Sequence, residues 1–377
     1  MSRPVNILHL HSSFSLGGKE ARAVRLMNAF GDRARHTIVS GVPDQLGARD
    51  AIAKGVSYEI AQDPPPLTGR PSVTRYEAIA TFMRRFDLVL TYNWGAIDGV
   101  MARRVFAKGA PPLIHHEDGF NADEAKRLDP VRNMYRRMAL GAAEALVVPS
   151  HVLEDIALRT WKQPAARVHR ISNGIDTARY ARKPDAKAIP GFVRKAGEFV
   201  VGSVAGLRAV KDLPMLVRAC AGMSGKVRLV IVGEGPEHGA IADAAEAMFF
   251  DTLHLPGFLA DPARYIGLFD VFALSSRSEQ QPIAVMEAMA AGLPVVAPPV
   301  GDVAEMVAPE GRMLIAEDWY EVHLRDRLQA VADNPAFARE VGAANQARAR
   351  ALFDERAMIT AYASLYGTAL GRPDALI

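Results

Sequence analysis

The chain has 377 residues, 49% of them hydrophobic, which is enough apolar material for two domains of roughly 150–200 residues each. Its 45 basic and 42 acidic residues give a net charge of only +3, which argues against a dedicated nucleic-acid-binding protein. The one cysteine, Cys220, excludes an intrachain disulfide and a cysteine-based zinc site, and its apolar neighbours favour a core position.

The start of the chain favours a cytoplasmic location. A strand-like segment follows Met1 within a few residues, without the apolar stretch that a signal peptide requires. No run of about 18 apolar residues occurs, so we expect no helix that spans a membrane.

Strand-like and helical patterns alternate through the first half of the chain. Helices are expected at Glu20–Phe30 and Val131–Ala143. The expected strands are Val5–Leu10, Thr37–Gly41, Leu88–Thr91, Leu113–His116 and Ala145–Val148. Such alternation is typical of βαβ units that build a parallel sheet with helices on both faces.

The same alternation continues after a polar linker. The stretch Arg179–Lys195 is rich in charge, proline and alanine, and it ends just before a new strand, so we place one domain at residues 1–185 and another at residues 190–354. The strands expected in the second domain are Phe199–Val204, Arg228–Val232, Leu253–Leu255, Val271–Leu274 and Pro294–Ala297. Both domains are expected to be α/β and Rossmann-like, with doubly wound parallel sheets facing a central cleft beyond the carboxyl ends of the strands.

Four polar residues, His115-His116-Glu117-Asp118, stand at the end of a predicted strand in the first domain. Ligands bind at the carboxyl ends of such strands, so this group lies where a site is expected. Histidines beside acids also suggest a metal site, but no further ligands at a suitable spacing accompany them, and we expect none.

The segment 126–138 combines a basic face with an apolar stripe. The stripe consists of Val131, Met134, Tyr135 and Met138. The basic residues are Lys126, Arg127, Arg132, Arg136 and Arg137. A basic amphipathic helix can lie on an anionic membrane surface, whereas the alternative is a surface helix with solvated arginines.

The strongest local signal follows the predicted strand Val271–Leu274. A helical pattern begins near Pro282, and proline is well tolerated in a first turn. The backbone N–H groups at this helix start form a site for an anion, which the helix dipole favours.

Two glutamates flank that helix start. Glu279 lies in the loop, where it can accept hydrogen bonds from sugar hydroxyls, and Glu287 lies more than one turn into the helix, where it can accept from both hydroxyls of a ribose. The alternative is a helix with two solvated carboxylates. The small apolar run Ala288–Gly292 makes that alternative less natural for Glu287.

The Glu-x7-Glu spacing of Glu279 and Glu287, followed by Ala-Met-Ala-Ala-Gly-Leu-Pro-Val-Val, closely resembles the hallmark of glycosyltransferase family 4. Members of this family are retaining enzymes with the GT-B fold. The resemblance extends over nearly the whole chain and includes the segments Gly17-Gly18, Ser172–Asp176, Gly202–Leu213, Val230–Pro236 and Val300–Glu305.

The resemblance implies that the C-terminal domain binds a nucleoside-diphosphate sugar. It assigns the ribose to Glu287, the sugar hydroxyls to Glu279, and the diphosphate to Lys211 and Arg208, where an arginine can fork to two oxygens and a lysine acts as a point charge. Further donor contacts are implied for Gln281, Pro282, Ile283, Gly233, Gly235 and Gly206.

The sequence departs from the family pattern at two places near the donor. Many members have their first diphosphate arginine where this chain has Gly206, so Lys211 is the firmer assignment and Arg208 must reach the phosphate by a shifted route. Gln280 and Gln281 replace a glycine and an aromatic or aliphatic residue, so the resemblance does not assign which sugar is selected. Gln281 is expected to offer an amide to a sugar hydroxyl.

In the N-terminal domain, the resemblance implies that the loop Gly17-Gly18 lets the backbone approach a phosphate or the acceptor closely. A family histidine that contacts the donor sugar and the reacting centre corresponds to His116, with His115 as the competing assignment. The last helix, within residues 355–377, is expected to pack back on this domain.

The implied activity is retaining transfer of a sugar to a hydroxyl of a sugar, lipid-linked or glycan acceptor in polysaccharide or glycolipid synthesis. No cofactor and no catalytic metal are expected, because catalysis would rest on positioning and electrostatic stabilisation of the leaving diphosphate. The alternatives are a GT-B epimerase or hydrolase, a catalytically inactive nucleotide-sugar-binding protein, and an NAD-dependent oxidoreductase. Against the oxidoreductase, Gly233-Glu234-Gly235 does not complete a dinucleotide fingerprint.

Overall fold

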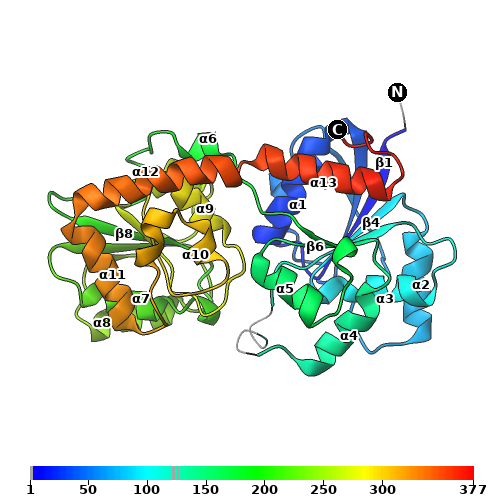
Figure 1. Cartoon of the computed structure of the whole chain (residues 1–377), viewed down its shortest axis with the longest axis horizontal. Helices are drawn as coiled ribbons and strands as arrows, with labels where there is room; N and C mark the ends of the chain where they lie inside the picture. Colours follow the sequence, from blue (N-terminus) through cyan, green and yellow to red (C-terminus); the bar gives the residue numbers. More distant parts are fainter. Residues whose placement is uncertain (1–2, 121–123, 125–126) are drawn as a thin grey trace. The chain divides into compact units, whose positions relative to one another are not determined.

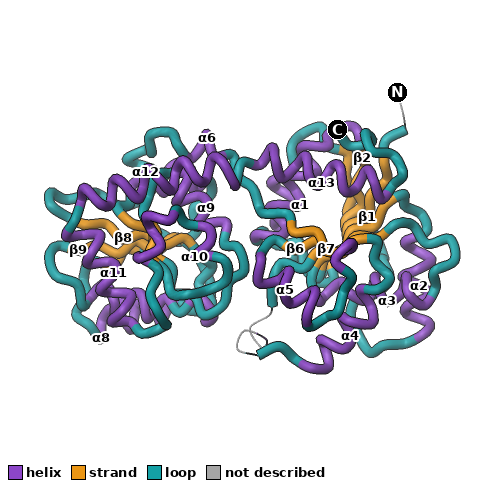
Figure 2. Tube along the Cα trace, in the orientation of Figure 1, coloured by secondary structure: helices purple, strands orange, loops and turns teal. Residues whose placement is uncertain are grey.

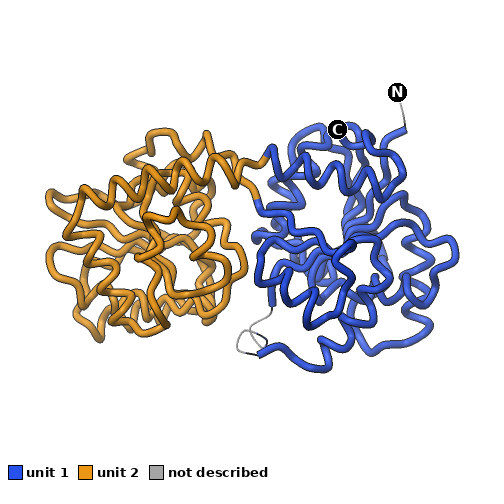
Figure 3. The backbone as a smooth tube through the Cα atoms, in the orientation of Figure 1, with its two compact units in different colours: residues 1–173, 356–377 blue, residues 174–355 orange. Residues whose placement is uncertain are grey.

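The computed structural model describes residues 3–120, 124 and 127–377 (Figure 1). The chain divides into two compact units (Figure 3), unit 1 with Met1–Asn173 and Arg356–Ile377 and unit 2 with Gly174–Glu355. This division lies earlier than the boundary at 185–190 that the linker composition suggested. The reason is that Ile175 and Tyr180 are buried in the core of unit 2, where Ile175 also pairs with Asp354.

Unit 1 contains a parallel sheet that, over the described residues, has seven strands in the order β3-β2-β1-β4-β5-β6-β7. Figure 2 shows strands in orange and helices in purple. The strands are β1 Val5–His11, β2 Ala34–Ser40, β3 Ser57–Ile60, β4 Leu88–Tyr92, β5 Leu113–His116, β6 Ala145–Val148 and β7 Val168–Arg170. Its helices of eight or more residues are α1 Gly18–Phe30, α2 Val73–Met83, α3 Ile97–Val105, α4 Pro130–Leu140, α5 His151–Arg159 and α13 Glu355–Ala369. The strand order reverses between β1 and β4, and in such sheets ligands bind beyond the carboxyl ends of the strands at this switch point.

Alternation of side chains along β1 divides the core of unit 1 between the two faces of the sheet. Val5 and Ile7 belong to an apolar cluster with residues of α1 and α13, whereas Leu8 and Leu10 belong to a cluster with residues of α2 and α3. Both faces are covered, as expected for a parallel sheet whose strands are buried on both sides.

The last helix, α13, packs on unit 1 through aromatic side chains. Tyr362 and Tyr366 are fully buried in the same cluster as β1 and α1. The ring of Tyr366 packs edge-on against Phe30, with ring centroids 6.1 Å apart.

Unit 2 is built on a parallel sheet of five strands, counted within the described part of the chain, in the order β10-β9-β8-β11-β12. The strands are β8 Phe199–Val204, β9 Val227–Val232, β10 Leu253–His254, β11 Val271–Ala273 and β12 Val295–Val296. The helices are α6 Thr177–Tyr180, α7 Leu213–Ala221, α8 His238–Ala247, α9 Ile283–Ala290, α10 Val303–Met306, α11 Glu321–Asp333 and α12 Pro335–Leu352. Here the strand order reverses between β8 and β11, so this pair of strands marks the switch point of unit 2.

The predicted fold class, two α/β units with parallel sheets, is confirmed. Two strands that were not predicted, β3 and β7, lie at the two edges of the first sheet. Three of the four residues of β3 are exposed and β7 has only three residues, so neither shows the apolar run of a buried strand. Helix α4 ends at Leu140 rather than at the predicted Ala143.

Within the described ranges, none of the helices combines the length and apolarity that crossing a bilayer would require.

Candidate functional site

The switch point of unit 2 brings together Lys211, which follows β8, and Glu279, which follows β11. The Lys211 ammonium group donates to a Glu279 carboxylate oxygen, which also accepts a hydrogen bond of 2.8 Å from the Ser276 hydroxyl. The Ser275 hydroxyl donates to the backbone carbonyl of Lys211 at 2.8 Å. The two loops are therefore tied to each other beyond the ends of neighbouring strands.

This ion pair is mostly buried, because the Lys211 side chain is 15% exposed and the Glu279 side chain 11% exposed. Two unit charges 4 Å apart interact by about 4 kcal/mol at an effective dielectric constant of 20, and burial preserves part of that interaction from screening. An ammonium group carries three N–H donors, so Lys211 can hold Glu279 and still donate to an anion.

Glu287 lies in the second turn of α9 and is only 9% exposed. The Tyr180 hydroxyl, from α6, donates a hydrogen bond of 2.6 Å to its carboxylate. This burial contradicts the alternative in which the Glu287 carboxylate is solvated. A tyrosine hydroxyl fixes the orientation of a carboxylate that carries further acceptor positions.

Close packing of two loops explains why glycines occupy positions 233 and 235. Their φ angles are +148° and +154°, a region that L-residues rarely adopt. A Cβ atom at Gly233 would lie 1.9 Å from the carbonyl oxygen of Ala205, and one at Gly235 would lie 2.3 Å from that of Leu207. The loops that follow β8 and β9 thus interlock and position the segment containing Gly206 and Arg208.

Arg208 lies on this segment with an exposed side chain, and its guanidinium has no hydrogen bond or ion pair to any residue that the structure describes. It is therefore available to a ligand. Its neighbour Gly206 is also exposed, and a Cβ atom there would meet nothing closer than 3.6 Å.

The turn at Gly301 and Asp302 packs against the loop that precedes α9. Pro282 is the N-cap residue and Ile283 the first residue of the helix, as the sequence indicated. Gly301 has a φ of +52°, and a Cβ atom there would lie 2.5 Å from the carbonyl oxygen of Gln280. The Asp302 N–H donates to the same carbonyl at 2.9 Å. Gln281, the residue before Pro282, is half-buried.

In unit 1, both predicted histidines at the end of β5 are fully buried. The ring of His115 contacts the Thr91 hydroxyl at 2.8 Å and a Glu117 carboxylate oxygen at 3.2 Å. The Nδ1 atom of His116 lies 3.1 Å from the carbonyl oxygen of Thr91, so it carries the proton and donates. Its Nε2 atom accepts from the Tyr366 hydroxyl at 2.8 Å. In this structure, neither ring presents a nitrogen to solvent.

The histidines and acids at the end of β5 were considered as metal ligands in the sequence. No group of three or more His, Cys, Asp or Glu residues arranged to hold a metal ion occurs among the described residues.

The predicted glycine loop lies where expected, since Gly17 is the exposed N-cap of α1 and Gly18 is its first residue. A Cβ atom at Gly17 would lie 2.9 Å from the Glu20 carboxylate, so the anion next to this helix start is a side chain of the protein. Glu20 is only 4% exposed and forms an ion pair with Lys19. Burial raises the pKa of Glu20 even though Lys19 opposes this.

Sequence reasoning missed Arg22 and Asn93, which lie beyond β1 and β4 in the first unit. Arg22 is 2% exposed and forms two hydrogen bonds to the Asp118 carboxylate. Asn93 has φ +56° and ψ −176°, a conformation that essentially only glycine adopts and that costs on the order of 1–3 kcal/mol. Arg22 could have been predicted, because an arginine on the apolar face of a helix is unusual. No sequence pattern indicated Asn93.

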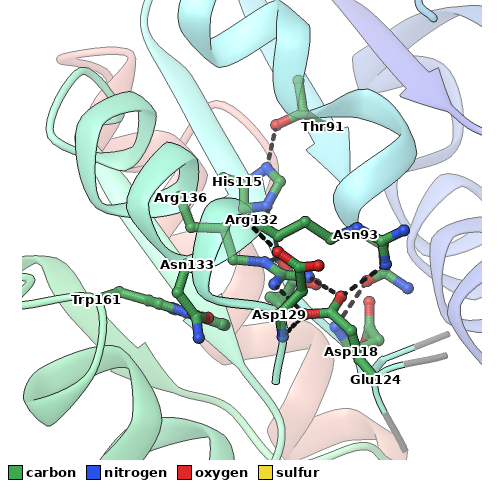
Figure 4. Close-up of polar contacts among 11 residues, drawn as sticks. Thr91, Asn93, His115, Asp118, Glu124, Asp129, Arg132, Asn133, Arg136 and Trp161 are labelled. Atoms are coloured by element: carbon green, nitrogen blue, oxygen red, sulfur yellow. Dashed lines mark hydrogen bonds and ion pairs between the residues drawn. The ribbon is translucent and has the colours of Figure 1, made fainter. Parts of the chain in front are cut away.

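The basic segment of unit 1 needs a correction, because Arg136 points into the protein (Figure 4). Its side chain is 0% exposed, donates to both oxygens of Glu124, and lies 3.6 Å from Glu117. The guanidinium also packs over the Trp161 ring. It is the hub of a buried polar cluster and cannot face a membrane.

The remaining basic residues of the segment are placed differently. Arg127 and Arg137 are exposed, and Arg132 is half-buried with an ion pair to Glu124. Lys126 lies outside the described residues.

Four of the buried histidines predict that unit 1 loses stability in mild acid. Burial is the main cause that lowers the pKa of His9, His11, His36 and His116, in the case of His36 to about 4. In the unfolded chain a histidine binds a proton near pH 6.5. Between pH 6.5 and about 4 the unfolded chain therefore binds more protons than the folded protein does. The free energy of unfolding is highest above pH 6.5 and decreases as the pH falls. His36 alone lowers it by about 3 kcal/mol at pH 4.

Hydrogen exchange followed by mass spectrometry at pH 7 and pH 5, corrected for intrinsic exchange rates, measures this effect for each unit. Unit 2 is the internal control, because its histidines His238, His254 and His323 are not buried. Protection is expected to fall in unit 1 and to hold in unit 2. An equal change in both units would contradict the assignment.

Comparison with known proteins agrees with this geometry. Residues 5–179 match the family model for Glycosyltransferase Family 4, and residues 198–334 match the model for Glycosyl transferases group 1. A GDP-mannose-dependent alpha-mannosyltransferase of Mycobacterium tuberculosis is 35% identical over 147 residues, which is 39% of this chain and 38% of that protein. An alpha-maltose-1-phosphate synthase of Mycolicibacterium smegmatis is 29% identical over 242 residues, which is 58% of this chain and 61% of that protein. The chain thus matches less than two thirds of the length of either relative.

Solved structures resemble the chain over most of its length. The Anabaena protein HepE in complex with UDP has a TM-score of 0.79 at 19% identity, covering 96% of this chain and 100% of that one. A sucrose-phosphate synthase from Thermosynechococcus elongatus has a TM-score of 0.77 at 21% identity, covering 97% and 99%. At these identities the likeness shows the fold. The two family models together with the two parallel-sheet units identify the chain as a member of the family 4, group 1 glycosyltransferases with the GT-B fold.

Proposed function

We propose that this protein transfers a sugar from a nucleoside-diphosphate sugar to a hydroxyl acceptor with retention of anomeric configuration, without a cofactor or a catalytic metal. The observation that carries the proposal is the mostly buried Lys211–Glu279 pair at the switch point of unit 2. In the proposed complex, Lys211 and the available Arg208 bind the diphosphate, and Glu279 accepts hydrogen bonds from the transferred sugar.

Glu287 is proposed to bind the ribose of the donor. Its carboxylate is nearly buried and held by Tyr180, which suits a residue that must accept from two hydroxyls at a fixed distance. Related structures support a nucleotide donor, since HepE was solved with UDP and with UDP-glucose. The base and the sugar that this chain prefers are left to experiment.

In the proposed reaction, departure of the nucleoside diphosphate leaves positive character on the sugar, and the acceptor hydroxyl attacks from the same face. The departing phosphate oxygen takes the acceptor proton, so no protein base is needed. Lys211 and Arg208 stabilise the negative charge that develops on the leaving group, and such stabilisation is usually the largest single contribution to catalysis.

A thermal-shift panel with UDP, GDP, ADP and NAD⁺, run on the wild type and on Glu287→Ala, tests the donor assignment. One nucleoside diphosphate is expected to raise the melting temperature of the wild type by mass action, and the shift is expected to disappear in the variant. Stabilisation by NAD⁺ alone would favour the oxidoreductase alternative. A nucleotide shift without any turnover would favour an inactive binding protein.

We further propose that α4 docks on the inner face of the membrane, where a polysaccharide or glycolipid acceptor is presented. Val131, Met134 and Met138 form an exposed apolar stripe, 78%, 56% and 45% exposed respectively. Exposed Arg127 and Arg137 lie on the same segment. Apolar side chains beside cations suit an anionic lipid surface.

Cosedimentation with phosphatidylglycerol vesicles measures this docking. Val131→Asp is expected to reduce vesicle binding at least tenfold, because it adds a charge to the apolar stripe. Val193→Asp is the matched control, since Val193 is a similarly exposed valine in unit 2 (74%) and its replacement should leave binding unchanged. Equal loss in both variants, or binding equal to phosphatidylcholine vesicles, would count against a docking face on α4.

A further inference from the structure

Asn93 occupies a position of unit 1 at which a ligand is expected. It follows β4 directly, and β4 is one of the two strands between which the strand order reverses. Its backbone is in a region that glycine adopts without strain and asparagine does not. An asparagine at this position has a side chain that can form hydrogen bonds, which glycine cannot.

Three hydrogen bonds hold Asn93 in this conformation. Its N–H donates to the carbonyl oxygen of His116 at 2.8 Å, and its own carbonyl accepts from Ala96 N–H at 3.1 Å. The side-chain oxygen accepts from the Asp118 N–H at 2.7 Å (Figure 4). A backbone N–H can only donate, so this last bond identifies the side-chain oxygen and leaves the NH₂ group on the other side as a donor.

The side chain of Asp118 is held just as firmly. Both of its carboxylate oxygens accept hydrogen bonds from Arg22, one of them at 2.8 Å, and Arg22 is itself nearly buried and bonded to the Asn173 side chain at 3.2 Å. The Asp118 side chain is still 13% exposed. Each carboxylate oxygen keeps a further lone pair, so Asp118 can accept another hydrogen bond.

The two side chains therefore form a fixed donor and a fixed acceptor on loops that follow neighbouring strands, β4 and β5. A hydroxyl group both donates and accepts, so two adjacent hydroxyls match an amide NH₂ beside a carboxylate. An ionised phosphate or carboxylate group offers only acceptors, so it has no hydrogen to donate to Asp118. The chemistry thus favours an uncharged polyol surface at this point.

We propose that Asn93 and Asp118 recognise two neighbouring hydroxyl groups of a sugar acceptor, so that the acceptor is a glycoside at this subsite. The inference rests on the proposed transferase function and adds the acceptor class and the residues that select it. A site built to bond a hydroxyl rejects an analogue that lacks it, because its buried polar groups are then left unpaired.

Two substitutions separate recognition from structural support. Asn93→Asp keeps an oxygen to accept the Asp118 N–H but removes the NH₂ donor. Asn93→Gly removes the whole amide and relieves the backbone strain, so it is expected to keep the fold intact. The matched control is Asn28→Asp in helix α1, because the Asn28 side chain also accepts a backbone N–H, from Ala53 at 2.8 Å.

Saturation-transfer NMR on the full chain measures binding of methyl α-D-glucopyranoside, methyl α-D-mannopyranoside and methyl α-D-galactopyranoside. At least one is expected to bind, with affinity reduced tenfold or more in Asn93→Asp and Asn93→Gly and unchanged in Asn28→Asp. Among deoxy analogues of the glycoside that binds, two neighbouring positions are expected to lose affinity.

The inference is overturned if none of the three glycosides binds, or if both Asn93 variants bind like the wild type. It is also overturned if binding is lost in Glu279→Ala while the Asn93 variants keep it, because the glycoside would then occupy the donor subsite. The nucleotide-induced thermal shift reports on unit 2. If nucleotide shifts the melting temperature of the wild type but the Asn93 variants bind glycoside normally, only the acceptor subsite is rejected. If no nucleotide shifts the melting temperature of the wild type, the proposed function is rejected.

Discussion

Lys211→Ala is expected to lower kcat by on the order of 10²–10³ while the protein stays folded. The ammonium group is proposed to stabilise the charge that grows on the departing diphosphate, so its loss should act on the chemical step. Its position beyond β8, tied to Glu279, supports this role. Steady-state kinetics with the preferred nucleotide sugar, together with a melting curve, measures both quantities.

Two further variants sharpen this prediction. Lys211→Arg keeps a cation but replaces a compact point charge with a planar fork, so it should recover only part of the rate. Lys226→Ala removes an exposed lysine just before β9 and should leave kcat unchanged. A Lys211→Ala enzyme that loses less than tenfold in rate with its fold intact would remove Lys211 from the proposed mechanism.

Arg136→Ala is expected to destabilise unit 1 by about 3–5 kcal/mol, the usual cost of leaving buried charges without their partner. Glu117 and Glu124 would remain in the interior without this guanidinium. Although burial alone would raise it, the hydrogen bonds from Arg136 and Arg132 hold the pKa of Glu124 below its ordinary value. Removing Arg136 should therefore also raise that pKa.

Urea unfolding followed by circular dichroism measures the loss. The control is Arg137→Ala, which deletes the same side chain from the exposed face of the same helix and should change stability by less than about 0.5 kcal/mol. Similar midpoints for the two variants would show that the buried cluster around Arg136 contributes little to stability.

Local sequence patterns were enough to predict most of the strands and the candidate residues for the donor site. The strands β5, β6 and β8 lie at the predicted residues because their apolar runs are bounded by clear breaks. The two glutamates Glu279 and Glu287 stood out because a strand end followed by a helix start is itself a recognisable pattern.

Contacts between distant residues were beyond such patterns. Arg22 meets Asp118 across 96 positions, and His116 meets Tyr366 across 250, so neither pair shows in any local spacing. The same limit explains why Arg136 was grouped with solvated arginines. Whether it faces outward depends on two acids brought to it by tertiary packing.

Donor turnover tests the central claim most directly. The protein is incubated with UDP-glucose, GDP-mannose or ADP-glucose and a glycoside acceptor, and proton NMR follows the anomeric signals. The account predicts that one donor is consumed, that a nucleoside diphosphate is released, and that the new glycosidic bond keeps the α configuration of the donor. An inverted product, or a folded protein that consumes none of the donors, would contradict it.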